Sequence, residues 1–297
     1  KRLMAGAKIS KAQGASITAQ IAGRSVGLIL GLTTSLTPFS VRSSFNALEN
    51  LSQEDKLAKL RDPVVRSTIL KEEVSDDLLS ILPPLTQAIA TRWDRMYPLG
   101  DPPNYEPTAD QSVQALATKE GKSPEEFAYD YLTGGDGNRK FLFPVTNYVS
   151  GDLEPVREML ADPDTLLGLS DGGAHVGLIS DASVPSFMLS HWGRDRSRGD
   201  RFAVEWLVKR QTSETADFFG FTDRGRLQIG KKADLNIIDF DNLRPRMPEI
   251  VNDLPAGGKR LVQRVDGYEA TIVSGEPIFE KGESTGARPG KLVRSVA

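Results

Sequence analysis

The residues best able to do chemistry lie in the glycine-containing segment SDGGAH, residues 170–175. Asp171 precedes two adjacent glycines, and His175, one of only two histidines in the chain, follows four positions later. A carboxylate can bind a divalent metal or exchange a proton with a hydrolytic water, and an imidazole can bind a metal or a substrate carbonyl. Aspartate before glycine more often forms a turn or a helix cap, and a loop histidine can simply bond to backbone. The spacing alone leaves both kinds of role open.

A short strand is predicted to position this segment. The run TLLGLS, residues 165–170, is apolar and follows the turn-like sequence ADPD, a pattern typical of a buried strand. Asp171 then stands at the carboxyl end of that strand, where α/β enzymes place their active sites. Gly172 and Gly173 allow a sharp turn or a close approach of backbone to a ligand.

A basic stretch, HWGRDRSR at residues 191–198, offers a second group of candidates. Arg194, Arg196 and Arg198 can pair with neighbouring aspartates at the surface, or they can recognise a substrate carboxylate, because a guanidinium suits planar bidentate binding. His191 is expected to pack beside Trp192.

Two further features are an acidic residue after the SDGGAH segment and a glycine-rich run that could be compared with a phosphate-binding loop. Asp181 is expected to hold a backbone group or an arginine. The run GGDGN, residues 134–138, lacks the lysine and the helix start of a phosphate-binding loop.

Composition excludes several classes of protein. The chain has 297 residues, 39% of them hydrophobic, and a net charge of −3, so nothing favours nucleic acid or anionic lipid as a partner. It has no cysteine, which excludes disulfides and thiolate metal sites. The most apolar run, residues 26–32, is too short to span a bilayer. We therefore expect a cytoplasmic protein with no membrane partner.

Patterning along the chain predicts an α/β body followed by a β region. One or two β-segments, broken at Gly23-Arg24, are expected within residues 15–34, and residues 82–110 are expected to form a long irregular connection. Residues 141–148 could be a strand or an aromatic loop. The predicted helices begin at Ser52 (N-cap), Pro63, Asp110, Ser123 (a capping box with Glu126) and Leu153, and a further helical stretch, residues 201–221, breaks near Gln211-Thr212. After Phe221 the sequence pattern becomes typical of β-strands, which predicts domains at 1–221 and 222–297.

The histidine count limits any metal site. A typical hydrolase metal centre needs several nitrogen or carboxylate ligands, and this chain has two histidines. Either the protein is no metalloenzyme, or its other ligands lie outside this sequence.

Several segments in combination resemble one known family. The runs LGLSDGGAHVGLISDA (167–182), HWGRDR (191–196) and GRLQIGKKADLNIIDFDNL (225–243) are similar to the N-acyl-D-amino-acid deacylase (D-aminoacylase) branch of the amidohydrolase superfamily. The segments ITAQIAGRSVGLILGL and TGARPG fit as well, so the resemblance covers nearly the whole chain.

This resemblance implies a fold and a set of roles. The fold is α/β: the C-terminal part of a (β/α)₈ TIM-type barrel of a metal-dependent hydrolase, plus a small β-sandwich. Asp171 would be both a metal ligand and the catalytic acid/base, while His175, Arg194 and Arg196 would contact substrate. Zinc is the expected divalent metal, with its other ligands outside this chain.

The expected activity is hydrolysis of a non-peptide C–N bond, the amide of an N-acyl (D-)amino acid. The expected partners are that small molecule or a related amide and a missing N-terminal half or a second copy of the chain. The alternative is a non-catalytic remnant or structural subunit without the metal-ligand half. A non-metal serine hydrolase is the weaker third idea, although residues 168–172, GLSDG, do place Ser170 in a Gly-x-Ser-x-Gly pattern.

Overall fold

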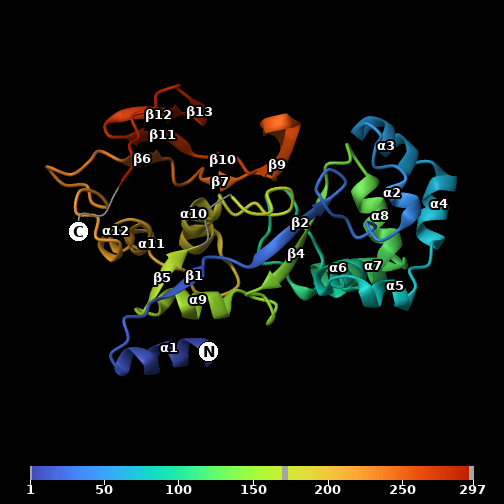
Figure 1. The fold of residues 1–297 in the computed structure, drawn as a ribbon, viewed down its shortest axis with the longest axis horizontal. Coiled ribbons are helices and arrows are strands. Elements are labelled where there is room, and N and C mark those ends of the chain that lie inside the picture. The colour runs from blue at the N-terminus through green and yellow to red at the C-terminus, as the bar shows by residue number, and fades with distance from the viewer. Residues whose placement is uncertain (1, 169–172, 294–297) are drawn as a thin grey trace.

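The computed structural model describes residues 2–168 and 173–293 and has a mixed α/β architecture. Figure 1 shows an elongated molecule with a lobe of helices at one end and the C-terminal strands at the other. Short strands and the helices that follow them connect these two ends. Within the described ranges, no helix has the length and apolarity needed to cross a bilayer.

The connecting region is built on two small sheets. β1 (Ala19–Ala22) pairs in parallel with β5 (Thr165–Gly168). β2 (Val26–Gly31) pairs antiparallel with β4 (Lys140–Thr146), and β3 (Tyr97–Pro98) adds to the other edge of β4. The predicted break at Gly23-Arg24 is confirmed, and the aromatic run after residue 140 is a strand rather than a loop.

The β2–β4 ladder is a wall shared by two hydrophobic cores. Successive side chains of a strand point to opposite faces, and both strands are apolar on both faces. The side chains that face the helical lobe are Leu28, Leu30, Phe141 and Phe143, and those that face the other core are Ile29 and Leu142. The ladder pairs residues of the same face, since Leu28 lies opposite Phe143 and Ile29 opposite Leu142.

The helical lobe surrounds one of these cores. Its α-helices are α2 (Ser43–Asn46), α3 (Gln53–Leu60), α4 (Pro63–Lys71), α5 (Asp76–Ile81), α6 (Pro84–Thr91), α7 (Val113–Glu120) and α8 (Pro124–Thr133), with 3₁₀ turns at Trp93–Arg95 and Ala109–Gln111. Predicted caps are confirmed: the Ser52 side chain accepts from the Asp55 amide, and Ser123 and Glu126 form a capping box.

Several helices were not predicted, α1 and α6 among them. α6 begins at Pro84, inside the stretch expected to be irregular, because proline at the first helical position starts a helix rather than breaking it. α1 (Arg2–Ala12) buries no residue and contacts the body through ion pairs of Lys8 with Asp162 and Lys11 with Asp164.

Helices after β4 pack around the second core. They are α9 (Glu154–Ala161), α10 (Val184–Phe187), the π-helix Met188–Asp195, α11 (Val204–Gln211) and α12 (Ser213–Phe218). The predicted break near Gln211-Thr212 is confirmed, since it separates α11 from α12.

The C-terminal region is made of short strands. They are β6 (Leu235–Ile238), β7 (Arg244–Pro245), β8 (Glu249–Leu254), β9 (Gly258–Val262), β10 (Val265–Asp266), β11 (Tyr268–Val273), β12 (Glu276–Glu280) and β13 (Glu283–Ser284), with a 3₁₀ turn at Pro255–Gly257. One sheet has the order β13-β12-β11-β6, while β8–β9 and β7–β10 form separate antiparallel pairs. The strand-like pattern predicted after Phe221 is confirmed, and β11 and β12 pair antiparallel across Ser274-Gly275.

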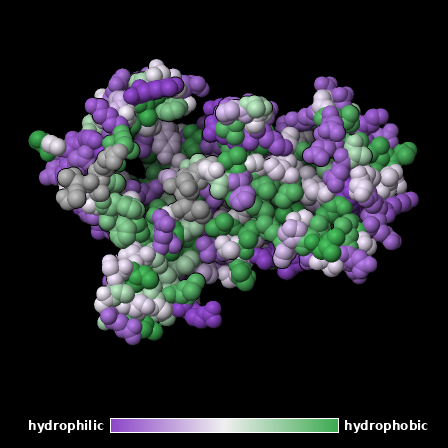
Figure 2. Space-filling view, viewed as in Figure 1, coloured by the Kyte–Doolittle hydropathy of each residue, from purple (hydrophilic) through white to green (hydrophobic). Residues whose placement is uncertain are grey.

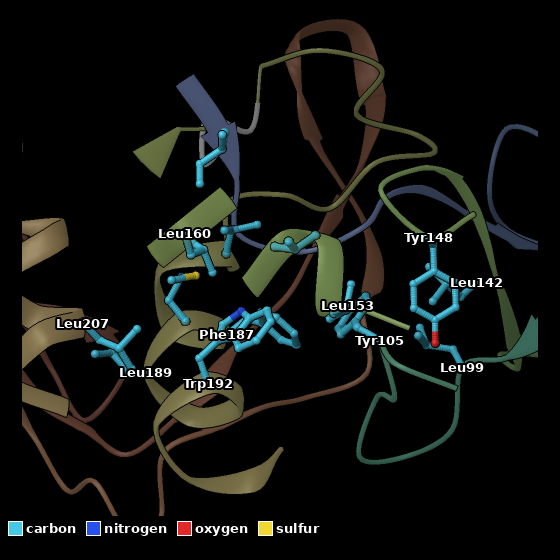
Figure 3. Close-up of a cluster of buried hydrophobic side chains, with 14 of the residues drawn as sticks. Leu99, Tyr105, Leu142, Tyr148, Leu153, Leu160, Phe187, Leu189, Trp192 and Leu207 are labelled. Carbon is cyan, nitrogen blue, oxygen red and sulfur yellow. The ribbon is translucent and has the colours of Figure 1, made fainter. Parts of the chain in front are cut away.

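The second core extends into this C-terminal region. Figure 3 shows Phe187 and Trp192 between Leu189 and Leu207 on one side and Tyr105 and Leu153 on the other. Leu243 and Leu261, which follow the boundary predicted at residue 221, belong to the same core. The two-domain division and the barrel-plus-sandwich arrangement stay predictions. Figure 2 shows hydrophobic residues gathered on the central part of one face, over β2 and β4, with hydrophilic residues towards both ends.

Candidate active site

The structure describes only part of the segment that carries Asp171 and His175. The predicted strand before it is confirmed as β5, Thr165–Gly168, and the description resumes at Gly173. Asp171, the predicted catalytic and metal-binding residue, lies outside the described residues. The site is therefore described from the residues that follow, beginning at Gly173, and from their contacts.

His175 lies at a turn on the surface. Its side chain is exposed and its φ is +49°, in the left-handed region that non-glycine residues seldom occupy. Its carbonyl accepts hydrogen bonds from the amides of Leu178 (2.8 Å) and Ile179 (3.0 Å). These bonds fix the turn and leave the imidazole facing solvent, where a substrate could reach it.

Backbone hydrogen bonds fasten the segment after His175 to three other parts of the chain. The carbonyls of Val176, Gly177 and Leu178 accept from the amides of Leu261 in β9 (2.6 Å), Ser35 (3.0 Å) and Ile29 in β2 (2.7 Å) respectively. Gly177 lies so close to Ser35 that a Cβ there would collide with its hydroxyl. The segment is thus held by both the central wall and the C-terminal region.

A buried ion pair lies where this segment enters α10. Arg24 donates to the Asp181 carboxylate over 3.1 Å and to the Ser180 carbonyl over 2.6 Å, and both charged side chains are about 95% buried or more. The Arg24 guanidinium also lies 4.0 Å from the centre of the Tyr105 ring. The expectation that Asp181 holds an arginine is confirmed. Because Arg24 follows β1 directly, this pair fixes the position of the segment relative to that strand.

A second buried network joins the π-helix to the loop before α7. The Glu106 carboxylate contacts His191 Nε2 at 2.9 Å and accepts from Arg196 Nε and Nη2, each at 3.2 Å. The amide of Leu153 also donates to it, over 2.9 Å. Burial opposes ionisation of Glu106, but the hydrogen bonds from His191 and Arg196 outweigh it and lower the pKa of this carboxyl to about 2. Glu106 is therefore an anion at neutral pH.

The aromatic surroundings of His191 agree with the prediction and extend it. Its ring lies at a right angle to Trp192, 5.5 Å away, and stacks on Phe187 at 4.5 Å. The Trp192 indole donates to the Gly23 carbonyl at 2.7 Å. His191 therefore packs beside Trp192 as expected, and it also has a carboxylate partner that sequence reasoning missed.

The structure distinguishes the three arginines of the basic stretch. Arg196 has no exposed side-chain surface, and Glu106 and Glu154 both pair with it, so its guanidinium has no free face for a substrate. The predicted substrate contact of Arg196 stays a prediction that these surroundings do not favour. Arg194 donates to the carbonyls of residues 240, 241 and 243 and pairs with Asp195, so it joins the π-helix to the C-terminal region.

Arg198 is the arginine of this stretch that lacks a carboxylate partner among the described residues. One of its guanidinium nitrogens donates to the carbonyls of Glu106 and Pro107 and to the Tyr148 hydroxyl, each over 3.1 Å. It lines a pocket of about 640 Å³ together with His191 and Arg194. Arginine recognition of a substrate at this pocket would therefore fall to Arg198.

Sequence reasoning missed two further residues of the site. Glu106 lies in the stretch expected to be irregular, which gave no periodic signal. Arg24 did give a signal, because it is a charged residue between two apolar β-segments, and such a residue must be paired if it is buried.

The described residues alone do not form a metal centre. Among residues 2–168 and 173–293, no three histidine, aspartate or glutamate side chains come close enough together to hold an ion. The described part of the chain therefore does not fit a zinc site by itself, and any centre would need ligands outside the described residues.

Comparison with known proteins identifies the family. The model of the amidohydrolase family matches residues 7–279. A D-aminoacylase of Alcaligenes xylosoxydans xylosoxydans is 30% identical over 152 residues, which are 50% of this chain and 29% of that protein.

Two solved D-aminoacylase structures are also similar to the chain. One, described as defining a novel subset of amidohydrolases, has a TM-score of 0.36 at 22% identity and covers 65% of this chain and 36% of its own. The other concerns a binuclear metal centre and has a TM-score of 0.35 at 19% identity, with coverage of 79% and 44%. The chain thus spans less than half the length of these relatives. Because the family model matches most of its residues, the chain belongs to the amidohydrolase family.

Proposed function

We propose that this chain is part of a metal-dependent amidohydrolase that hydrolyses the non-peptide C–N bond of N-acyl amino acids, D-amino acids among them. The observation that carries the proposal is the family match over residues 7–279, which includes the SDGGAH segment. The similarity to a D-aminoacylase supports the choice of substrate class.

In this proposal Asp171 is the acid/base. Its carboxylate takes a proton from the hydrolytic water as that water attacks the amide carbonyl, and then delivers the proton to the leaving nitrogen. His175 contacts the substrate from the exposed turn four residues later. The cofactor is zinc, with Asp171 as one ligand and further ligands from polypeptide outside the described residues. Action on a small molecule in the cytoplasm stays a prediction.

The test measures amide hydrolysis by the protein at its native length, with N-acetyl-D-amino acids as substrates. Asp171→Asn should abolish turnover and leave the thermal unfolding temperature unchanged, whereas Asp110→Asn, at an exposed position, should leave both unchanged. Turnover by Asp171→Asn at the wild-type rate would overturn the role of Asp171. Elemental analysis of the active protein tests for zinc.

A non-catalytic role is the second candidate. It is favoured by the lack of a three-ligand group among the described residues. A native-length protein that binds no divalent metal and hydrolyses no N-acyl amino acid would support this role against the hydrolase.

A further inference from the structure

A second pocket, of about 650 Å³, lies against the segment that follows His175. It is lined by the loop after β2, residues 32–37, by α2 and α3, and by the β8–β9 hairpin. Figure 1 places β9 and α3 on either side of that loop. The contact with the segment is direct, because the Ser35 amide donates to the Gly177 carbonyl at 3.0 Å. The volume suits a small molecule.

Two lysines from distant parts of the chain meet at this pocket. Lys56 comes from α3, with its ammonium 4.6 Å from the centre of the Phe45 ring. Lys259 comes from β9, and its ammonium donates to the Thr33 carbonyl over 3.2 Å. Among the described residues neither lysine pairs with a carboxylate, although Glu49 lies in the same lining. The pocket therefore carries a net positive charge.

The surroundings of the Lys56 ammonium favour the binding of an anion. Burial lowers the pKa of this lysine, Glu49 raises it, and the charge of Lys259 lowers it again. A half-buried ammonium beside a like charge is less stable than the same group in water. A bound anion would offset both the lost hydration and the repulsion.

The rest of the lining selects the kind of anion. Hydroxyl and amide side chains make up much of this lining, and Leu32, Leu36, Leu51 and Ile250 add apolar surface to it. An inorganic ion would leave this surface without a partner, whereas a molecule with a hydrocarbon part and one carboxylate would cover it. Among the described residues no arginine lines the pocket, so none of them provides the planar guanidinium that binds phosphate through two hydrogen bonds.

We propose that this pocket binds a small organic carboxylate, with Lys56 and Lys259 at its charged end and the leucines at its hydrocarbon part. Binding at this pocket does not depend on the proposed hydrolysis. Because the Ser35 amide in its loop donates to the Gly177 carbonyl, the pocket adjoins the segment after His175.

Calorimetric titration of the protein at pH 7 tests this site with three probes. Hexanoate should bind, hexanamide should bind at least 10-fold more weakly because it has no charge, and inorganic phosphate should not displace hexanoate. Lys259→Gln should weaken hexanoate binding at least 10-fold. Lys119→Gln, at an exposed lysine outside the pocket, is the matched control and should have no effect.

Folding and binding are separated by a second variant. Lys56→Met keeps the apolar stem and removes the desolvated charge, so it should lose hexanoate binding at least 10-fold without lowering the unfolding temperature. The proposal is overturned if hexanoate fails to bind, or if it binds the two lysine variants as tightly as the wild type. It is also overturned if hexanamide binds as well as hexanoate. Equal competition by phosphate would overturn it too, because that result would define an inorganic-anion site.

Discussion

Replacing Glu106 with glutamine should remove a large, pH-dependent contribution to stability. The carboxylate is 4% exposed and holds both His191 and the fully buried guanidinium of Arg196. Glutamine keeps the shape but not the charge. It would therefore leave the buried guanidinium with Glu154 as its remaining carboxylate partner.

The magnitude follows from the pKa of Glu106. A decrease from the ordinary value of 4.5 to about 2, at 1.36 kcal/mol per pKa unit, corresponds to about 3 kcal/mol of folding free energy. This agrees with the ~3–5 kcal/mol typical of removing one partner from a buried ion pair. Because the folded-state pKa is the lower one, the stabilisation is complete above the unfolded pKa. It is lost as the pH falls through 4.5 towards 2.

Urea denaturation followed by tryptophan fluorescence measures this effect at several pH values between 7 and 3. We expect Glu106→Gln to lower the free energy of unfolding by about 3 kcal/mol at pH 7, with the difference from wild type shrinking as the pH falls. Glu154→Gln is the control. It removes the more exposed partner of the same arginine, with 39% of its side chain accessible, and should cost about 1 kcal/mol or less.

A constant difference between Glu106→Gln and wild type across this pH range would refute the reasoning, because it would mean that the charge of Glu106 does not stabilise the fold. Equal costs for the two variants at pH 7 would refute it as well, since burial would then not distinguish the two carboxylates.

Three further substitutions test the packing around the site. Asp181→Asn leaves the buried guanidinium of Arg24 without its ion-pair partner and should cost about 3–5 kcal/mol in urea denaturation. Trp192→Phe loses the hydrogen bond to the carbonyl of Gly23 and part of the buried indole, so we expect about 1–3 kcal/mol by the same measurement. Gly267→Ala introduces a Cβ at a φ of +92°, within 2.7–2.8 Å of three backbone atoms, and should lower the unfolding temperature clearly, whereas Gly282→Ala, at a φ of +83° with open space around it, should lower it less.

Local features of the fold could be predicted from the sequence because their causes are local. Ser123 and Glu126 cap a helix through bonds that span three residues, and the break at Gly23-Arg24 follows from a glycine and a charge between apolar runs. α6 was missed because consecutive prolines indicate irregular structure as readily as a helix start. α1 was missed because it has no buried face to produce an apolar pattern.

The site was harder to predict because its contacts join distant residues. Glu106 and His191 are 85 positions apart, and Arg24 and Asp181 are 157 apart. A sequence reveals the type of each residue but not which partner it meets. The resemblance therefore assigned Arg194 and Arg196 to substrate alike, whereas burial and pairing distinguish Arg196 from its neighbours Arg194 and Arg198.

The β2–β4 ladder has a consequence for how the molecule opens. Each of its strands supplies alternate side chains to the two cores. Loss of the ladder would therefore remove packing from both cores at once. A slip of one residue in its register would exchange the two sets of side chains and disrupt both cores at once. The helical lobe and the rest of the chain should therefore unfold as one cooperative unit. The amide hydrogens of Leu28 to Leu30 should then exchange with solvent only when the whole protein unfolds.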